Sequence, residues 1–237
     1  MRFTIHRFDS VSSTNDVAAG RPEGTVIIAA EQTAGKGRLG RSWTSPPGEG
    51  LYLSIVLRPP LPFDRLWQTA FVVSLAACEA IRQVSGLDAR IKWPNDILIG
   101  DRKVCGILIE TRGRGDAETR RPVIAGIGIN VNNQSFPPDF NATSIAIEIG
   151  HQIPMADVEE SLLARLDARY SRFLTDGFPP ILEAWKALDC TIGRRVTVHT
   201  PDAVIEGAAM EVTDDGDLVI RRDDGTWVNV KAGEVIL

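Results

Sequence analysis

A run of glycines and cations in the first fifth of the chain has the composition of an anion-binding loop. From Glu31 to Trp43 the sequence reads EQTAGKGRLGRSW, in which three glycines alternate with three basic residues. Glycine lets the backbone approach a ligand closely, and successive backbone N–H groups can surround phosphate or carboxylate oxygens. Arg38 adds a planar guanidinium that can pair with two oxygens at once. We therefore predict a loop that binds a nucleotide or another anion.

The same glycines satisfy the dinucleotide-binding pattern G-x-G-x-x-G, which requires a strand before it and a helix after it. Residues 25–30 can form the strand, but residues 42–48 read SWTSPPG and residues 51–58 then alternate like a strand. A Rossmann site is therefore not expected. The Walker A pattern is also absent, because no Gly-Lys-Ser/Thr ends the run. A plain solvated hairpin loop remains the alternative interpretation.

A second candidate cation, Lys92, lies in a short apolar stretch. Residues 91–99 read IKWPNDILI, and after a polar turn residues 104–110 form another apolar stretch. Two such stretches around a polar turn predict a pair of strands. The apolar neighbours of Lys92 would hold its ammonium on one face of the sheet. Alternatively, Lys92 is an edge-strand cation that prevents aggregation, and Pro94 favours a strand end.

The elements that position these residues follow an α/β order. Strands are expected at residues 25–30, 51–58, 89–93, 97–99, 104–110 and 123–131. A long helix is expected over residues 65–84, with Asp64 as its cap and Gly86 as its end.

Two further features concern the ends of the chain. Ser13 is expected to cap a short helix in a capping-box arrangement with Asp16. From Cys190 onward the pattern changes to short alternating strands with Asp-Gly turns, which predicts a small separate β domain.

Five ordered motifs resemble those of biotin protein ligases. They are Ser13-Thr14-Asn15, Gln32 with residues 35–43, Lys92-Trp93-Pro94-Asn95-Asp96, Gly106-Ile107-Leu108-Ile109-Glu110 and Gly126-Ile127-Gly128-Ile129-Asn130-Val131-Asn132. The resemblance covers essentially all 237 residues. It implies a mixed-sheet catalytic domain of the biotin/lipoate ligase type over residues 1–188 and an SH3-like β-barrel over residues 189–237. Lys36 departs from the family, which usually has Arg there and uses mainly the backbone of that residue.

The resemblance implies an ATP-dependent, AMP-forming enzyme. Such ligases activate biotin to biotinyl-5'-AMP and transfer biotin to a lysine of the biotin carboxyl carrier protein or domain of a carboxylase. The expected ligands are biotin, ATP and Mg²⁺, and the sequence does not identify residues that hold the metal. Two alternatives remain. A lipoate or octanoate ligase or transferase would lack the loop over residues 35–43, and a noncatalytic biotin sensor could lose Lys92 or Arg38.

The resemblance also implies roles for individual residues. Lys92 and Arg38 are the expected catalytic residues, Lys92 on the biotin carboxylate and α-phosphate oxygens and Arg38 on the phosphates. The expected biotin contacts are Ser13, Thr14, Asn15, Gln32, Lys36, Gly37, Arg38, Lys92, Gly106 and Ile107. The expected nucleotide contacts are Arg38, Arg41, Trp43, Lys92 and Asn130.

Composition narrows the biological setting. The formal net charge of −5 gives no global basic field for nucleic acid, and the motifs begin so near Met1 that we expect no N-terminal DNA-binding domain.

Three widely spaced cysteines in apolar surroundings predict reduced thiols and a cytoplasmic protein. No apolar run approaches the ~18 residues of a membrane span. An exposed strand edge could pair two copies, so a homodimer is left open.

Overall fold

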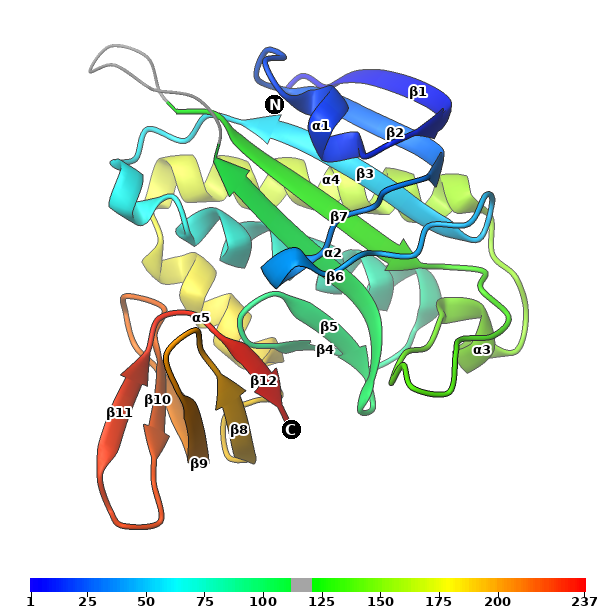
Figure 1. Ribbon diagram of the computed structural model, residues 1–237. Helices are drawn as coiled ribbons and strands as arrows, with labels where there is room; N and C mark the ends of the chain where they lie inside the picture. The colour runs from blue at the N-terminus through cyan, green and yellow to red at the C-terminus, as the bar shows by residue number, and fades with distance from the viewer. Residues whose placement is uncertain (112–120) are drawn as a thin grey trace.

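A seven-stranded mixed sheet forms the centre of the computed structural model, which describes residues 1–111 and 121–237 (Figure 1). The strands are β1 (Thr4–Val11), β2 (Thr25–Gln32), β3 (Gly50–Leu57), β4 (Ala89–Lys92), β5 (Asp96–Ile99), β6 (Arg102–Thr111) and β7 (Val123–Asn130). Their order in the described part of the sheet is β1-β2-β3-β7-β6-β5-β4. Only the β1–β2 pairing is parallel among these strands. The expected mixed sheet is therefore confirmed, with β4, which carries Lys92, at one edge.

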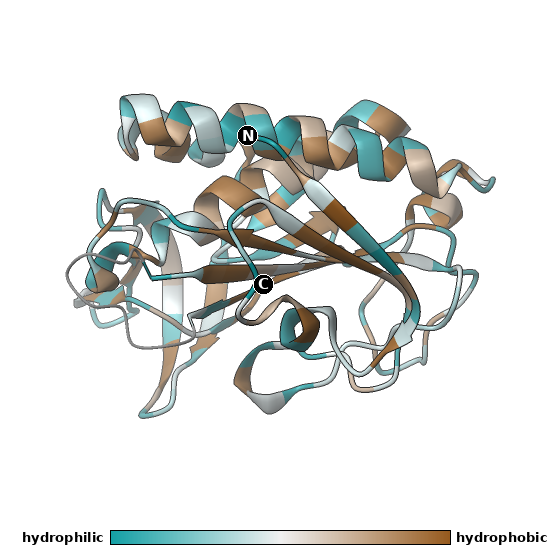
Figure 2. Ribbon diagram, turned by 90° about the horizontal axis from the view of Figure 1, so that it is seen from above, coloured by the Kyte–Doolittle hydropathy of each residue, from teal (hydrophilic) through white to brown (hydrophobic). Residues whose placement is uncertain are grey.

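Three helices cover one face of this sheet, and a short helix and a loop lie on the other. The helices α2 (Gln68–Ser85), α4 (Met155–Asp176) and α5 (Pro179–Leu188) lie behind the sheet in Figure 1. Figure 2 shows largely hydrophobic strands between these helices and the loop side. The opposite face carries α1 (Thr14–Ala18) and the glycine-rich loop, while α3 (Ile145–Ile149) lies at one end. The hydrophobic core between the helices and the sheet thus holds the strands in position. The face that carries α1 and the glycine-rich loop is available for a site.

The helix expected over residues 65–84 begins later than the sequence suggests. A separate 3₁₀ turn, η2 (Phe63–Arg65), precedes it, and the Leu66 N–H bonds to the Phe63 carbonyl at 3.3 Å. This turn brings Leu66 into the core, where it is 2% exposed. Asp64 therefore lies inside the short turn rather than at the start of α2. Gly86 ends α2 in the left-handed region at φ 71°, as expected.

Ser13 does stand at the N-terminal cap of α1, but the expected capping box is wrong. The Ser13 hydroxyl makes no capping hydrogen bond; its backbone carbonyl accepts from the Asp16 N–H at 3.1 Å. The Asp16 carboxylate instead accepts from Lys36 Nζ at 2.6 Å. This ion pair ties α1 to the glycine-rich loop.

A second, antiparallel sheet follows the last helix. Its five strands are β8 (Arg195–His199), β9 (Val204–Val212), β10 (Leu218–Arg221), β11 (Trp227–Val230) and β12 (Glu234–Ile236), ordered β11-β10-β9-β8-β12. Trp93 Nε1 donates to the Gly216 carbonyl at 2.9 Å, and the Cys190 N–H donates to the Ile91 carbonyl at 2.9 Å. Buried backbone and indole groups therefore join this sheet to the strand that carries Lys92.

Two other expectations concern the whole molecule. The three cysteines are free thiols, and burial raises the pKa of Cys78 to about 12. Within residues 1–111 and 121–237, none of the helices is both long and apolar enough to cross a membrane.

Candidate active site

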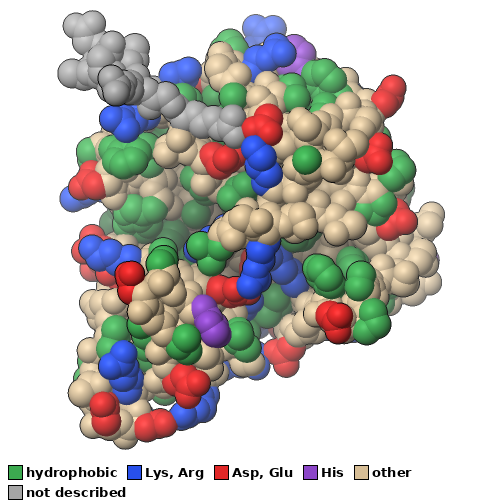
Figure 3. Space-filling model, in the orientation of Figure 1, with side chains coloured by type: hydrophobic (Ala, Val, Ile, Leu, Met, Phe, Trp, Pro, Cys, Tyr) green, Lys and Arg blue, Asp and Glu red, His purple; other side chains and the backbone are tan. Residues whose placement is uncertain are grey.

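A cavity of about 1010 Å³ lies on the loop side of the central sheet and extends to the C-terminal sheet. Figure 3 shows basic and acidic side chains side by side near the centre of this face. Every residue that the sequence predicts for ligand contact lines the cavity: Ser13, Thr14, Asn15, Gln32, Lys36, Gly37, Arg38, Arg41, Trp43, Lys92, Gly106, Ile107 and Asn130. Five motifs that are far apart in the sequence therefore form one continuous surface.

The glycine-rich loop over residues 33–44 is a closed hairpin rather than the start of a helix. The Trp43 N–H donates to the Gly35 carbonyl at 2.9 Å, and the Gly37 N–H donates to the Arg41 carbonyl at 2.8 Å. One 3₁₀ turn, η1 (Arg38–Gly40), forms its tip. The chain then continues into strand β3, so the structure lacks the helix that a Rossmann site requires.

The tip of the loop stores backbone strain. Leu39 has φ 55°, a left-handed conformation that non-glycine residues adopt rarely. Its side chain is 65% exposed, so apolar packing does not stabilise this conformation. Strained residues of this kind concentrate at binding sites and at segments that change conformation.

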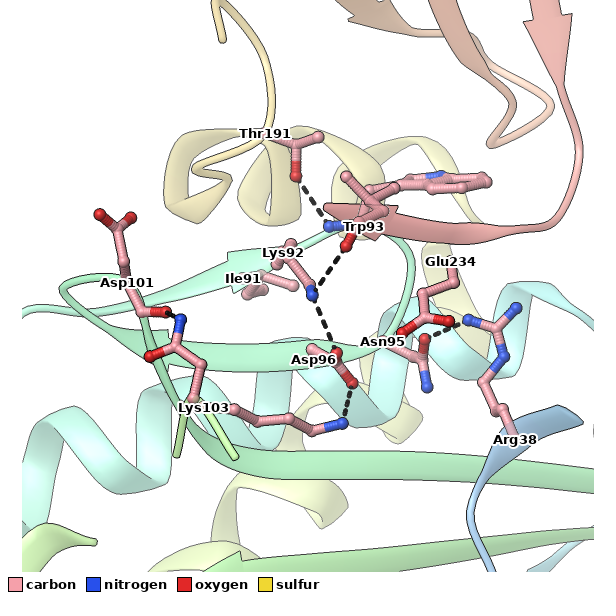
Figure 4. Close-up of polar contacts among 12 residues, drawn as sticks. Arg38, Ile91, Lys92, Trp93, Asn95, Asp96, Asp101, Lys103, Thr191 and Glu234 are labelled. Carbon is pink, nitrogen blue, oxygen red and sulfur yellow. Dashed lines mark hydrogen bonds and ion pairs between the residues drawn. The ribbon is translucent and has the colours of Figure 1, made fainter. Parts of the chain in front are cut away.

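A group of charged side chains, here called the charged cluster, comprises Asp96, Lys92, Lys103 and Arg38 (Figure 4). Lys92 ends β4 directly opposite Asp96 at the start of β5. Lys92 Nζ lies 3.2 Å from Asp96 Oδ2, and Lys103 Nζ lies 2.6 Å from Oδ1. Burial favours the neutral form of Asp96, but the two ammonium groups, Lys103 foremost, outweigh it and hold its pKa below the usual value. Asp96 is therefore an anion, and the cluster carries excess positive charge.

Arg38 reaches the cluster through an amide. Its guanidinium donates to Asn95 Oδ1 at 2.5 Å, and Asn95 Nδ2 in turn donates to the Ile107 carbonyl of β6. Burial lowers the pKa of Arg38, while the nearby carboxylates of Asp96 and Glu234 oppose this shift. The arginine is thus held against the sheet.

The C-terminal strand contributes to the same wall of the cavity. Glu234 of β12 forms a two-pronged ion pair with Arg41 of the loop. Lys92 Nζ donates to the Val235 carbonyl at 3.1 Å. The sequence left the role of the small β domain open; its last strand contacts both the loop and the lysine strand.

Trp43 lies across the glycines of two neighbouring strands. A Cβ atom built on Gly128 would come within 2.5 Å of the indole, and one built on Gly106 within 2.9 Å. Lys103 Nζ stands 5.4 Å from the ring centroid, in cation–π range. The indole Nε1 is buried without a hydrogen-bond partner among the described residues. Gly106 and Gly128 thus form a flat platform for one aromatic ring.

Thr14, Asn15 and Gln32 line another part of the cavity, and the buried hydroxyls of Ser45 and Ser54 contact them from behind; we call these five residues the neutral cluster. Gln32 Oε1 accepts from the Thr14 N–H at 2.9 Å, and Gln32 Nε2 donates to Ser45 Oγ at 2.9 Å. Ser45 Oγ also donates to the Trp43 carbonyl at 3.1 Å. Asn130, on β7, donates to the Thr143 carbonyl at 3.0 Å and is 5% exposed. These amides and hydroxyls are fixed by other protein groups before any ligand arrives.

The carboxylates of the cavity are not gathered into a group of three that could hold a metal ion, as far as residues 1–111 and 121–237 show. In the described part of the chain, no group of three His, Cys, Asp or Glu side chains is placed to hold a metal ion. Both oxygens of Asp96 are paired with lysines, and Asn95 Oδ1 accepts from Arg38. The site therefore offers cations and amides to an anionic ligand.

Comparisons with known proteins agree with this geometry. The model of the biotin/lipoate A/B protein ligase family matches residues 8–130, and the model of the biotin protein ligase C terminal domain matches residues 191–237. The "Biotin--[acetyl-CoA-carboxylase] ligase" of Paracoccus denitrificans is 37% identical over 222 residues, which cover 88% of each chain. The chain belongs to the biotin protein ligase family.

Other biotin protein ligases support this assignment. The "Bifunctional ligase/repressor BirA" of Bacillus subtilis is 37% identical over 226 residues, 92% of this chain and 69% of that protein. The structure of the biotin protein ligase from Aquifex aeolicus in complex with biotin and ATP superposes with a TM-score of 0.85 at 28% identity, covering 98% of this chain and 97% of that one.

Two residues at this cavity were not predicted from the sequence: Lys103, which lines it, and Ser54, which lies buried behind Thr14 and Asn15. Lys103 reads as an ordinary turn cation after Gly100-Asp101, and its position over the site depends on a β-bulge between Ile97 and Leu98. Its side chain is 33% exposed against 17% for Lys92, so it is the more accessible of the two ammonium groups. Ser54 reads as a small residue in an apolar strand, and nothing in its local sequence indicates a partner.

Proposed function

We propose that the chain activates biotin with ATP to biotinyl-5'-AMP and then transfers the biotinyl group to a lysine of a carrier protein. In the first step a biotin carboxylate oxygen bonds to the α-phosphorus of ATP and pyrophosphate leaves. In the second step the lysine amine attacks the anhydride carbonyl and AMP leaves. The observation that carries the proposal is that a charged cluster and a neutral cluster share one cavity beneath a glycine-rich loop.

The charged cluster suits the first step because two anions must meet there. Lys92 is assigned to the biotin carboxylate and the α-phosphate oxygens, and Lys103, which stands on the other oxygen of Asp96, shares this task. Positioned cations offset the repulsion between the reactants and stabilise the charge that develops on the phosphoryl group. Asp96 keeps the two ammonium groups in place, and so it is a positioning residue.

Arg38 and the loop are assigned to the phosphates and to shielding the adenylate. The arginine can pair with two phosphate oxygens, and its bond to Asn95 holds it at the wall of the cavity. A loop that closes over the mixed anhydride keeps water away until the acceptor lysine arrives. The nucleotide base is assigned to Trp43, Arg41 and Asn130, which line the same cavity.

The neutral cluster is assigned to the ureido ring of biotin. Ser13, Thr14, Asn15 and Gln32 offer donors and acceptors, together with the backbone of Lys36 and Gly37. Gly106 and Ile107 supply an apolar wall, and Ile107 is 2% exposed. Small-molecule sites commonly combine a few fixed polar groups with such walls. The side chain of Lys36 is engaged by Asp16, so its contribution to biotin is through the backbone.

Mg²⁺ and the acceptor complete the proposed reaction. Because both oxygens of Asp96 are paired, Mg²⁺ would be held mainly by phosphate oxygens and water, where it neutralises phosphate charge. The proposed acceptor is the biotin carboxyl carrier domain of a carboxylase.

Pyrophosphate exchange into ATP tests the proposal. The assay is run with biotin, lipoate or octanoate as the only acid. Exchange with biotin alone is the expected result. Exchange with lipoate or octanoate would instead identify a ligase for those acids, and tight biotin binding without exchange would identify a sensor.

A further inference from the structure

The edge strand β4 ends at Lys92, and its outer edge is covered by residues 189–192. We call these residues the linker, because they lead from α5 toward the C-terminal sheet. An isolated β-bridge pairs Asp189 with Ile91 in parallel. The Cys190 N–H donates to the Ile91 carbonyl at 2.9 Å. The linker therefore continues the central sheet by one short row beyond β4.

The next contact along this edge uses a side chain in place of a backbone carbonyl. The Trp93 N–H donates to Thr191 Oγ1 at 2.8 Å (Figure 4). Both residues lie away from water, because Thr191 is 0% exposed and Trp93 is 1% exposed. Loss of the Thr191 hydroxyl would therefore leave a buried N–H unpaired, which is costly.

These two bonds hold the backbone on both sides of Lys92. The peptide group before Lys92 carries the carbonyl that the Cys190 N–H binds. The peptide group after Lys92 carries the N–H that binds Thr191. The two backbone dihedral angles of Lys92 lie between these peptide groups. The linker therefore sets the direction in which the Lys92 side chain leaves the strand.

The ammonium end of Lys92 is held from the C-terminal sheet as well. Lys92 Nζ donates to the Val235 carbonyl of β12 at 3.1 Å and lies 3.2 Å from Asp96 Oδ2. An ammonium group has three protons, so these two contacts leave one for an anionic ligand. A shift of the Lys92 backbone would move that remaining donor away from its target.

The carboxylate of Asp189 sets the position of the Thr191 hydroxyl. Asp189 Oδ2 accepts from the Thr191 N–H at 2.8 Å and from the Ile192 N–H at 2.6 Å. A carboxylate that binds backbone N–H groups two and three residues ahead holds the chain in a turn. Asp189 directly follows the last residue of α5, so this turn is anchored on a helix.

We propose that Thr191, held by Asp189, is a positioning residue for biotin adenylation that sets where the Lys92 ammonium stands. Trp93 and Lys92 line the cavity, and Thr191 lies behind them. This inference rests on the proposed function and adds to it a residue that acts through Lys92. Because a misplacement of about 1 Å can cost about 100-fold in rate, one lost hydrogen bond behind the cavity is enough to slow the reaction.

Thr191→Val tests the proposal, because valine keeps the shape of the side chain and removes the acceptor. The kcat of biotin-dependent pyrophosphate exchange is measured at saturating biotin and ATP, and the dissociation constant of biotin is measured calorimetrically without ATP. We expect kcat to fall about tenfold and the dissociation constant to stay within about twofold. Thr191→Ser restores the hydroxyl and should restore kcat.

Ser74→Ala is the matched control for lost stability. Trp185 Nε1 donates to Ser74 Oγ at 3.0 Å in the core between α2 and α5, so this substitution also leaves a buried N–H without its hydroxyl. It should lower the free energy of unfolding in urea without lowering kcat. An equal fall of kcat in Ser74→Ala and Thr191→Val, both assayed where they are fully folded, would overturn the proposal.

A double-mutant cycle shows whether Thr191 acts through Lys92. In a Lys92→Ala protein, Thr191→Val should change kcat by less than about twofold, because the group that it positions is gone. A further tenfold fall in that background would contradict the inference. If Thr191→Val does not fold, Thr191→Cys is measured under reducing conditions. Its thiol is a weak acceptor, so kcat should fall by a smaller factor, and an unchanged kcat would overturn the proposal.

The outcomes distinguish this inference from the proposed function. Absence of biotin-dependent exchange in the unsubstituted protein would remove the proposed function. If that exchange is present and Thr191→Val keeps the unsubstituted kcat, the proposed function stands and the inference about Thr191 is wrong.

Discussion

The charged cluster and the neutral cluster lie at one cavity but are built from opposite kinds of side chain. The charged cluster gathers Arg38, Lys92 and Lys103 around a single aspartate, so positive charge is in excess before a ligand arrives. In the neutral cluster, uncharged donors and acceptors bond to one another, as the backbone N–H and the hydroxyl of Thr14 do to Gln32 Oε1. One region has positive charge in excess, and the other consists of neutral groups that are already hydrogen-bonded.

This difference teaches how a single pocket can separate chemistry from recognition. In the proposed reaction the cations would stabilise the charge that develops during phosphoryl transfer, and their effect would be greatest in the transition state. A urea ring does not change during the reaction, so its contacts are equally strong in the ground state and the transition state. Substitutions in the charged cluster should therefore act on kcat, and those in the neutral cluster on biotin affinity.

The largest effect is expected from Lys103→Ala. Loss of this ammonium should lower kcat for biotin adenylation by about 100-fold or more, because preorganised charges act mainly on the transition state. Biotin affinity measured without ATP should change far less. The assay is biotin-dependent pyrophosphate exchange, combined with calorimetric titration of biotin.

Two matched variants sharpen this prediction. Lys92→Ala should also lower kcat, although its ammonium is less exposed than that of Lys103. Lys231→Ala removes an exposed lysine on the C-terminal domain and should have no effect. A Lys103→Ala protein that loses biotin affinity while kcat stays intact would break the distinction between the two clusters.

An intermediate effect is expected from Asp96→Asn. The substitution should lower the free energy of unfolding by an amount that depends on pH. Because the folded protein holds the pKa of Asp96 below its usual value of 3.8, the ionised carboxylate stabilises the fold above that pH. This stability should be lost as the pH falls through the lowered pKa. Asp96→Asn leaves two ammonium groups without their anion, so it should cost about 3 kcal/mol at pH 7 and make stability less dependent on pH in acid.

Urea unfolding at pH 7 and at acid pH measures both the loss of unfolding free energy and its dependence on pH. Asp202→Asn, which alters an exposed carboxylate of the C-terminal domain, is the control and should behave like the unsubstituted protein. Equal acid sensitivity in Asp96→Asn and the unsubstituted protein would show that Asp96 is not the ionised centre of the cluster.

The smallest effect is expected from the ion pair between Arg41 and Glu234 at the rim of the cavity. Its side chains are 64% and 30% exposed, so solvent and salt screen the interaction. A double-mutant cycle with Arg41→Gln and Glu234→Gln should give a coupling of about 0.2–1 kcal/mol in unfolding free energy. A coupling above about 2 kcal/mol would mean that the rim behaves like the buried charges and that the C-terminal strand is a fixed wall.

Residue types predicted which segments line this cavity, because the glycines and cations of the loop are adjacent in the sequence. Glycines alternating with cations indicate anion binding whatever the surrounding fold, and the strand carrying Lys92 was recognisable from its apolar neighbours. The start of α2 was placed too early, since the sequence does not reveal that burying Leu66 requires a separate 3₁₀ turn.

The missed residues depend on contacts between distant segments. Lys103 faces Asp96 only because of the register of β5 and β6, and a single bulge sets that register. Ser54 meets Thr14 and Asn15 across about forty positions of sequence. A serine in a strand of buried residues is indistinguishable by type from one that merely fills space.

The indole of Trp43 fills part of the cavity, against Gly106 and Gly128. Any ligand that needs the platform of Gly106 and Gly128 competes with this side chain, so its measured affinity is the intrinsic affinity reduced by the fraction of molecules with the platform vacant. If the indole leaves the platform in about one molecule in a hundred, the apparent dissociation constant is about a hundredfold higher than the intrinsic one. A weak measured affinity for that ligand would then reflect the free energy of displacing Trp43 rather than poor contacts with the ligand.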